Sequence, residues 1–114
     1  MIKETNGEEF DAILRIYSAV ILDVWAEWCG PCKQMAGIID QVSEAFPYVS
    51  FRKSNVDEDP SLAKRFNVMS IPTLLFFDKG KLVDTVIGAI PRETLHKKVW
   101  DNFVKYDDEK RGPF

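Results

Sequence analysis

One stretch of the sequence constrains the fold more than any other. Residues 19–25, Ala-Val-Ile-Leu-Asp-Val-Trp, are apolar at every position except Asp23. A strand with one face in water alternates apolar and polar residues, so an unbroken apolar run indicates a strand that is buried on both faces. Such a strand needs a covering layer on each side. We therefore expect an open α/β sheet with helices on both faces.

Apolar residues at helical spacing predict three amphipathic helices and one shorter helical turn. Asn6, with Glu9 three positions later, is a candidate capping box for the first helix, and Pro47 ends the second. Asp59 and Pro60 are typical of an N-cap and a first helical position, so the short turn should follow them. The helical segments are expected at residues 10–17, 35–46, 62–66 and 95–106.

The remaining apolar segments predict strands. Residues 2–5 are a candidate first strand, and residues 49–56 form another. Pro72 opens a strand over residues 73–77, since proline is tolerated at the first position of a strand. A turn then leads into residues 82–87, so these last two strands should form an antiparallel hairpin at one edge of the sheet.

The length and the net charge of the chain limit the class of protein. The 114 residues are enough for one domain with its own core, expected over residues 1–106, with a charged tail over 107–114 that should fray. Fifteen Lys and Arg against eighteen Asp and Glu give a net charge of −3. Neither a nucleic acid nor a membrane surface is expected as a partner, because both call for a basic patch.

The two cysteines and the start of the chain indicate a compartment. Six charged side chains in the first twenty residues leave no apolar signal-peptide core, and no apolar run is long enough to span a bilayer. A cytoplasmic location is therefore expected, where disulfides are usually transient and catalytic.

Both cysteines lie in residues 28–33, Trp-Cys-Gly-Pro-Cys-Lys. A Cys-x-x-Cys pair either exchanges a disulfide or supplies half of a metal site. Zinc needs about four N or S ligands, and His96 is the one histidine in the chain, so no metal or other cofactor is expected. A permanent disulfide would close too small a loop to restrict the unfolded chain much. Thiol–disulfide exchange is the favoured interpretation.

The position of the pair between a strand and a helix assigns a role to each thiol. Cys29 should lie at or just before the helix start, where free N–H groups and the helix dipole favour a thiolate. We expect Cys29 to be the exposed attacking nucleophile and Cys32, one turn inward, to be the resolving thiol. Gly30 and Pro31 suit a tight helix entry, and as a stiff spacer they influence how easily the disulfide is reduced. Lys33 either adds positive charge or is an ordinary solvated residue.

Asp23 is the second candidate for chemistry. An ionised carboxylate inside an apolar strand is costly, so burial should raise its pKa and let it hold a proton near neutral pH. We interpret it as a proton acceptor for Cys32; the alternative is an edge Asp that faces solvent. Lys53, in the neighbouring strand, is its candidate charge partner, although alone it would be read as a solvent-facing lysine.

Residues 22–33, Leu-Asp-Val-Trp-Ala-Glu-Trp-Cys-Gly-Pro-Cys-Lys, closely resemble the active-site stretch of the thioredoxin family. The resemblance covers roughly residues 2–105. It continues in Lys53 with Asn55-Val56-Asp57, in Ser70-Ile71-Pro72-Thr73, in Lys79-Gly80 and in Gly88-Ala89. It implies the thioredoxin fold, a central mixed β-sheet in a three-layer α/β/α arrangement. It also implies a protein-disulfide reductase and electron carrier that serves cell redox homeostasis by dithiol–disulfide exchange.

The resemblance also implies site residues and partners. Asp23 matches the family's buried acid and Lys53 its partner, and the bond before Pro72 is expected to be cis. Ile71 would offer its backbone groups to an extended substrate segment. The implied partners are protein disulfide substrates and a thioredoxin reductase, either NADPH-flavin or ferredoxin-linked, and the protein is expected to be a monomer. The implied apolar docking patch consists of Trp28, Gly30, Pro31, Ile71, Pro72, Gly88 and Ala89.

Two departures from the family pattern and three alternative functions stay open. Gly37 stands where the family usually has a helix-kinking proline, and a mid-helix glycine costs about 1 kcal/mol relative to alanine. Met69 and Ser70 occupy a stretch that often includes glycine. The alternatives are a disulfide oxidase or isomerase on the same fold, a non-catalytic binding subunit of a larger assembly, and a metal or iron–sulfur carrier shared across a dimer.

Overall fold

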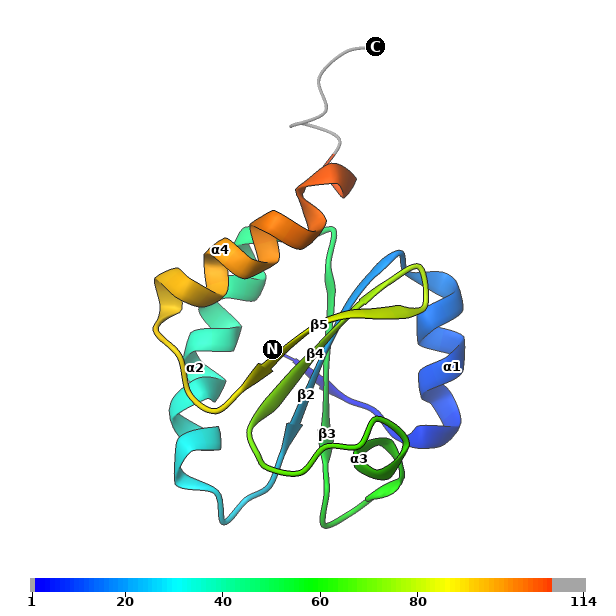
Figure 1. Cartoon of the computed structure of the whole chain (residues 1–114), viewed down its shortest axis with the longest axis vertical. Helices are drawn as coiled ribbons and strands as arrows, with labels where there is room; N and C mark the ends of the chain where they lie inside the picture. Colours follow the sequence, from blue (N-terminus) through cyan, green and yellow to red (C-terminus); the bar gives the residue numbers. More distant parts are fainter. Residues whose placement is uncertain (1, 108–114) are drawn as a thin grey trace.

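The computed structural model describes residues 2–107 as a mixed five-stranded sheet with helices on both faces (Figure 1). Beyond Asp107, the predicted tail lies outside the described residues. The strands are β1 (Lys3–Glu4), β2 (Ala19–Trp25), β3 (Ser50–Asn55), β4 (Thr73–Asp78) and β5 (Lys81–Ile87). The helices are α1 (Gly7–Ile16), α2 (Gly30–Ala45), α3 (Ser61–Arg65) and α4 (Arg92–Phe103), followed by a 3₁₀ turn, η1 (Val104–Tyr106). No helix within residues 2–107 is long and apolar enough to cross a membrane.

The apolar strand β2 lies at the centre of the sheet, whose strand order is β1-β3-β2-β4-β5. It pairs in parallel with β3 and antiparallel with β4. β4 and β5 form the predicted antiparallel hairpin, with a bulge between Phe76 and Phe77. Every residue of β2 except Trp25 is buried. The α/β class with a mixed sheet, covered on both faces, is confirmed.

Alternate residues of β2 point into two separate cores. Ala19 and Ile21 pack in one core with side chains from α2 and α4, the two helices on the left of the sheet in Figure 1. Val20 and Leu22 pack in the other with side chains from α1 and α3. A fully buried aliphatic or aromatic side chain contributes about 1.5–3 kcal/mol. By the same alternation, Asp23 belongs to the face that α2 and α4 cover.

The first helix begins at the predicted cap, and the third begins one residue later than predicted. α1 begins after Asn6, whose Oδ1 accepts a hydrogen bond from the Glu9 N–H at 2.9 Å, one half of the predicted capping box. α3 begins at Ser61, with Pro60 at the cap position, so the prediction of Asp59 as the N-cap is wrong by one residue. The reason is a long-range contact: the Asp59 carboxylate accepts from the Gly7 N–H at 2.8 Å and from the Ser61 N–H at 2.9 Å. It therefore joins α1 to α3.

The last turn of the described chain is fastened to the end of β4. Tyr106 was expected in the final helix but lies in η1. Its hydroxyl donates a hydrogen bond to Asp78, which also forms an ion pair with Lys105. These contacts hold η1 against the last residue of β4.

Candidate active site

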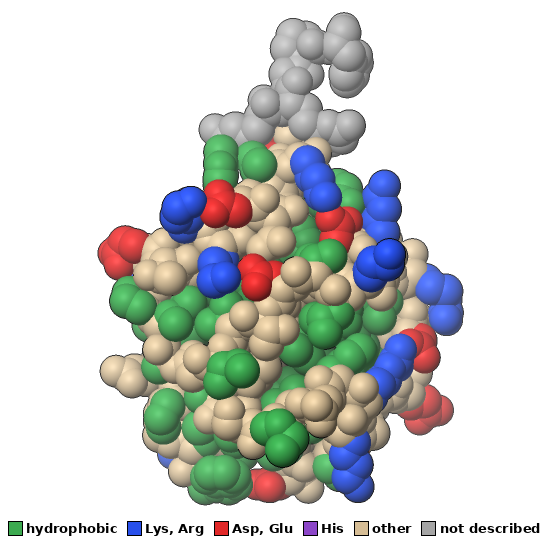
Figure 2. Space-filling model, in the orientation of Figure 1, with side chains coloured by type: hydrophobic (Ala, Val, Ile, Leu, Met, Phe, Trp, Pro, Cys, Tyr) green, Lys and Arg blue, Asp and Glu red, His purple; other side chains and the backbone are tan. Residues whose placement is uncertain are grey.

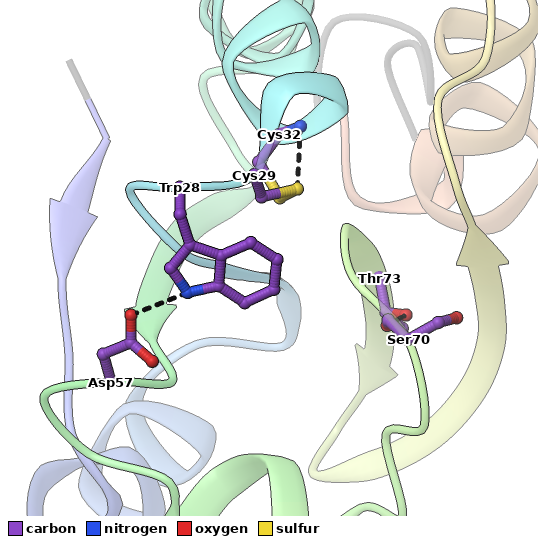
Figure 3. Close-up of a disulfide and its surroundings, with 6 residues drawn as sticks. All are labelled: Trp28, Cys29, Cys32, Asp57, Ser70 and Thr73. Atoms are coloured by element: carbon purple, nitrogen blue, oxygen red, sulfur yellow. Dashed lines mark hydrogen bonds between the residues drawn. A yellow bond between two sulfur atoms is a disulfide. The ribbon is translucent and has the colours of Figure 1, made fainter.

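The two cysteines form a disulfide at the first turn of α2 (Figure 3). Cys29 is the N-cap residue, and its Sγ accepts a hydrogen bond from the Cys32 N–H at 3.2 Å. Gly30 and Pro31 are the first residues of the helix. The Cα atoms of the two cysteines are 5.2 Å apart. The predicted placement of both thiols at the helix start is confirmed.

Cys29 is more buried than its position at a helix start predicts. Its residue is 5% exposed, close to the 3% of Cys32, so the expectation of an exposed Cys29 is wrong for this disulfide form. Ala26 packs with both cysteines, and Val56 and Ile71 are packed against this small cluster. Position along a helix carries no information about such packing, because the covering side chains come from other parts of the chain.

A shallow groove of about 450 Å³ runs beside the disulfide. Trp28 is 69% exposed on its rim, and its indole N–H donates to the Asp57 carboxylate at 2.9 Å (Figure 3). Met69 is 86% exposed and lines the same groove. In Figure 2, hydrophobic side chains gather on the lower part of the visible face, while most charged side chains lie along its upper part and its right side. The groove is lined by Trp28, Val56, Ala63, Val68, Met69, Ser70 and Ile71.

The loop before β4 brings two predicted docking segments together. The Ile71–Pro72 bond is cis, as predicted. The Pro72 carbonyl accepts a hydrogen bond from the Gly88 N–H at 2.8 Å, and Gly88 has φ +85°, a left-handed conformation that glycine adopts without strain. Within residues 2–107, the N–H and C=O groups of Ile71 make no hydrogen bond. A partner strand can therefore pair with them.

Three other predicted docking residues lie at the surface. Gly30 and Pro31 are exposed beside the disulfide they separate, and Ala89 is exposed directly after Gly88. The predicted docking residues therefore fall into two groups: Trp28, Gly30, Pro31 and Ile71 around the disulfide and its groove, and Gly88 with Ala89 beyond Pro72. Pro72 itself is buried, so the prediction that it forms part of the docking surface is wrong.

Asp23 is buried in β2, with 7% of the residue exposed. Its pKa is raised from 3.8 to about 7, chiefly by burial; within that net value, the positive charge of Lys53 lowers the pKa and the negative charge of Glu4 raises it. Its buried Oδ1 has no hydrogen-bond partner among the described residues. The predicted burial and raised pKa are confirmed, and the carboxyl group can exchange a proton near neutral pH.

Lys53 acts on Asp23 without touching it. The two residues are directly opposite in the register of β2 and β3. Among the ion pairs of residues 2–107, however, none joins them. The Lys53 ammonium instead lies 4.9 Å from the centre of the Trp25 ring, a favourable cation–π contact. Lys53 therefore acts on Asp23 through its charge and not through a direct ion pair.

Two residues beside the site had no predicted role. Glu4 accepts hydrogen bonds from the Trp25 indole N–H at 2.8 Å and from the Asn55 N–H at 3.3 Å. Asp57 holds Trp28 in place. The resemblance of the segment 55–57 to the family was a usable signal for Asp57. Nothing in the sequence marked Glu4, because strand pairing alone brings it beside Lys53. Within residues 2–107, no group of three His, Cys, Asp or Glu side chains is arranged to hold a metal ion.

Comparison with known proteins gives a consistent result. The family model described as Thioredoxin matches residues 1–101. Thioredoxin 1 of Synechococcus elongatus is 46% identical over 77 residues, 67% of this chain and 72% of that protein. The chloroplastic M-type thioredoxin of Pisum sativum is 46% identical over 100 residues, which cover 86% of this chain and 58% of that longer protein.

Solved structures of similar proteins have the same fold. The oxidised form of mitochondrial thioredoxin 3 from Saccharomyces cerevisiae matches with a TM-score of 0.82 at 35% identity, over 88% of this chain and 94% of that one. Plasmodium falciparum thioredoxin matches with a TM-score of 0.81 at 34% identity, over 90% of this chain and 99% of that one.

Proposed function

The chain belongs to the thioredoxin family, and from that premise we propose that Cys29 and Cys32 act in a fixed order on protein disulfides. The protein is a thiol–disulfide oxidoreductase that reduces the disulfides of other proteins. The observation that carries this function is the Cys29–Cys32 disulfide at the first turn of α2.

The proposed reaction transfers two electrons. The Cys29 thiolate attacks one sulfur of the substrate disulfide, which forms a mixed disulfide and releases the other substrate sulfur as a thiolate. Cys32 then passes its proton to the Asp23 carboxylate and attacks the Cys29 sulfur. That step breaks the mixed disulfide, closes Cys29–Cys32 and releases the second substrate thiolate. A reductase restores the dithiol by supplying two electrons.

The position of Cys29 supports its role as the attacking sulfur. Its Sγ already accepts the Cys32 N–H, one of the free donors at the helix start. The sixteen-residue α2 adds the positive end of its dipole at the same place. Both effects stabilise a thiolate, and the thiolate is the form that attacks.

The position of Asp23 supports its role as the proton acceptor. A base transfers protons most efficiently when its pKa lies near the working pH, and the pKa of Asp23 is about 7. The carboxyl lies on the sheet face that α2 covers, and Cys32 belongs to the first turn of α2.

The proposed docking surface combines the groove with the loop beside it. The unpaired Ile71 backbone would add a strand-like contact to an extended substrate segment, and Trp28 and Met69 would cover its side chains. The further proposed docking residues are Gly30, Pro31, Gly88 and Ala89; the buried Pro72 is not among them.

Replacing each site residue tests the proposed order. Cys29→Ser should abolish reduction of insulin disulfides, because no attacking thiolate remains. Cys32→Ser should trap mixed disulfides with target proteins. Asp23→Asn should slow turnover at neutral pH. Unchanged insulin reduction by Cys29→Ser would refute the assignment, and an unchanged rate and pH profile in Asp23→Asn would refute the proton transfer.

The proposal also covers the cofactor, the oligomeric state, the cellular location and the reductase. We propose that the protein needs no bound cofactor, works as a monomer in the cytoplasm, and is recharged by a thioredoxin reductase that is either NADPH-flavin or ferredoxin-linked. Insulin assays driven by each reductase in turn distinguish the two sources. The potential of the Cys29–Cys32 couple separates a reductase from an oxidase or isomerase, because a reductase has the more reducing value.

A further inference from the structure

We propose that Glu4 is a positioning residue for the proton transfer at Asp23, and that it acts by competing for the Lys53 ammonium. The inference rests on the proposed role of Asp23. Its basis is the strand order: β3 lies between β1 and β2. Lys53 on β3 is in register with Glu4 on one side and with Asp23 on the other. Lys53 is therefore the middle residue of a row across the three strands, with an acidic residue on each side.

Both oxygens of the Glu4 carboxylate are held in place. Oε1 accepts from the Trp25 indole N–H at 2.8 Å, and Oε2 accepts from the Asn55 N–H at 3.3 Å. The same Trp25 ring carries the Lys53 ammonium, 4.9 Å from its centre. Trp25 is two residues after Asp23 on β2, so both side chains belong to the same face of the sheet. Glu4, the indole and the ammonium thus form one connected group beside Asp23.

This arrangement favours the protonated form of Asp23 in two ways. The Glu4 charge attracts the Lys53 ammonium, which then stabilises the Asp23 carboxylate less, and it also repels that carboxylate directly. In agreement, Glu4 raises the pKa of Asp23 while Lys53 lowers it. Among the described residues, Lys53 and Glu4 are the charges that shift the pKa of Asp23. On β4 the residue opposite is Leu74, α4 contributes apolar side chains to this core, and Cys32 of α2 is held in the disulfide.

The functional consequence is that the pKa of Asp23 stays close to neutral pH. Without the Glu4 charge, Lys53 would stabilise the ionised Asp23 more strongly, and the carboxylate would become a weaker base for the Cys32 proton. Glu4 thus keeps the proton acceptor effective at the pH at which the thiols react, although it touches neither substrate nor sulfur.

The test is a titration of the Asp23 carboxyl carbon by NMR in the oxidised protein, where neither thiol titrates. Glu4→Gln removes the charge and keeps an acceptor oxygen, and it should lower the Asp23 titration midpoint by roughly 0.5 pH unit. Glu4→Asp keeps the charge, so its Asp23 midpoint should lie between that of Glu4→Gln and that of the unaltered protein. Glu8→Gln removes the same charge from an exposed position in α1 and should leave the midpoint in place. An unchanged midpoint in folded Glu4→Gln overturns the proposal, even if that variant unfolds at a lower temperature.

Two further measurements separate this inference from its premises. In a Lys53→Met background, Glu4→Gln should shift the midpoint by less than half as much; an undiminished shift overturns the competition for Lys53. The acid limb of the insulin-reduction profile should move down in pH with the Asp23 midpoint in Glu4→Gln. If the midpoint moves and the profile does not, Glu4 does not serve the reaction. If the unaltered protein fails to reduce insulin, the proposed function itself is wrong, and the titration still reports on Glu4.

Discussion

Gly37 shows how much one missing side chain can matter. It lies in the middle of α2 on the exposed side, and a Cβ built there meets no atom within 4 Å outside its own stretch of helix. The position therefore has room for a side chain, and the glycine brings only its cost. That cost is entropic, because glycine loses more backbone freedom on folding than any other residue.

We predict that Gly37→Ala raises the free energy of unfolding by about 1 kcal/mol. Insulin reduction should change little, because the helix start that carries the disulfide lies two turns away. Urea unfolding of the oxidised protein measures the change. Gly88→Ala is the matched control with the opposite sign: its surroundings are also open, but its φ of +85° strains any other residue. A loss of stability in Gly37→Ala would mean that the glycine shapes the helix.

Single residues were predictable where their chemistry is unusual for their context. The cysteine pair and Asp23 stand out because a thiol pair at a helix start and a carboxylate in an apolar strand each need an explanation. Glu4 does not, because an acid near the start of a chain is ordinary until strand pairing places it beside Lys53. The burial of Cys29 was missed because residues far along the chain, such as Ile71, cover it.

At the scale of elements, Asp59 joins two helices that are separated by half the chain. Its carboxylate accepts the Gly7 N–H at the start of α1 and the Ser61 N–H at the start of α3. These two backbone hydrogen bonds lower the pKa of Asp59 below its usual value. The ionised form is therefore favoured in the folded protein more than in the unfolded chain.

Asp59→Asn should destabilise the protein at neutral pH, and the difference should vanish in acid. Because the folded pKa is lowered, the contribution of Asp59 is present above the unfolded pKa of about 3.8. It is lost as the pH falls through the folded value. Urea midpoints at pH 7 and near pH 2.5 test this, and Glu58→Gln, at the exposed neighbouring position, is the control. An equal loss at both pH values would assign the effect to shape and not to charge.

The order and type of the elements were readable from the sequence, and their ends less so. Apolar periodicity located all four helices and the central strand, because each buries one face or both in a core. Asp59 was predicted as the N-cap of α3, which is Pro60; the Asp59 carboxylate also binds Gly7, 52 residues away. Capping rules use only neighbouring residues, so they cannot predict a contact between residues so far apart in the chain.

Across the described residues, four aspartates with shifted pKa values form two sets with opposite effects on stability. Asp23 has a raised pKa because it is buried. Burial alone would also raise the pKa values of Asp78 and Asp84, but hydrogen bonds and ion pairs outweigh it and hold both below the usual value. Lys105 and Tyr106 supply them to Asp78, and Asn102, Thr85 and Lys98 supply them to Asp84.

These two sets predict a stability maximum in mild acid, at about pH 4–5. Below it, Asp59, Asp78 and Asp84 become protonated and their contributions are lost. Above it, Asp23 ionises in the unfolded chain but stays protonated in the fold until about pH 7, so stability declines over that range. Asp23→Asn should remove the decline and gain about 4 kcal/mol at neutral pH, with no gain below pH 4. Urea unfolding across pH 2.5–8 measures both curves. Parallel curves would show that Asp23 is not protonated in the fold.

The groove beside the disulfide has a consequence for the lifetime of the folded state. Its walls come from separate parts of the chain, around Trp28, Val56, Ala63 and residues 68–71. The unfolded chain therefore has no such surface, and any protein that docks there binds the native form alone. By mass action, a partner present at a hundred times its dissociation constant adds about 2.7 kcal/mol to the free energy of unfolding. A substrate that docks in this groove, as proposed, would thus also protect the chain from unfolding and proteolysis.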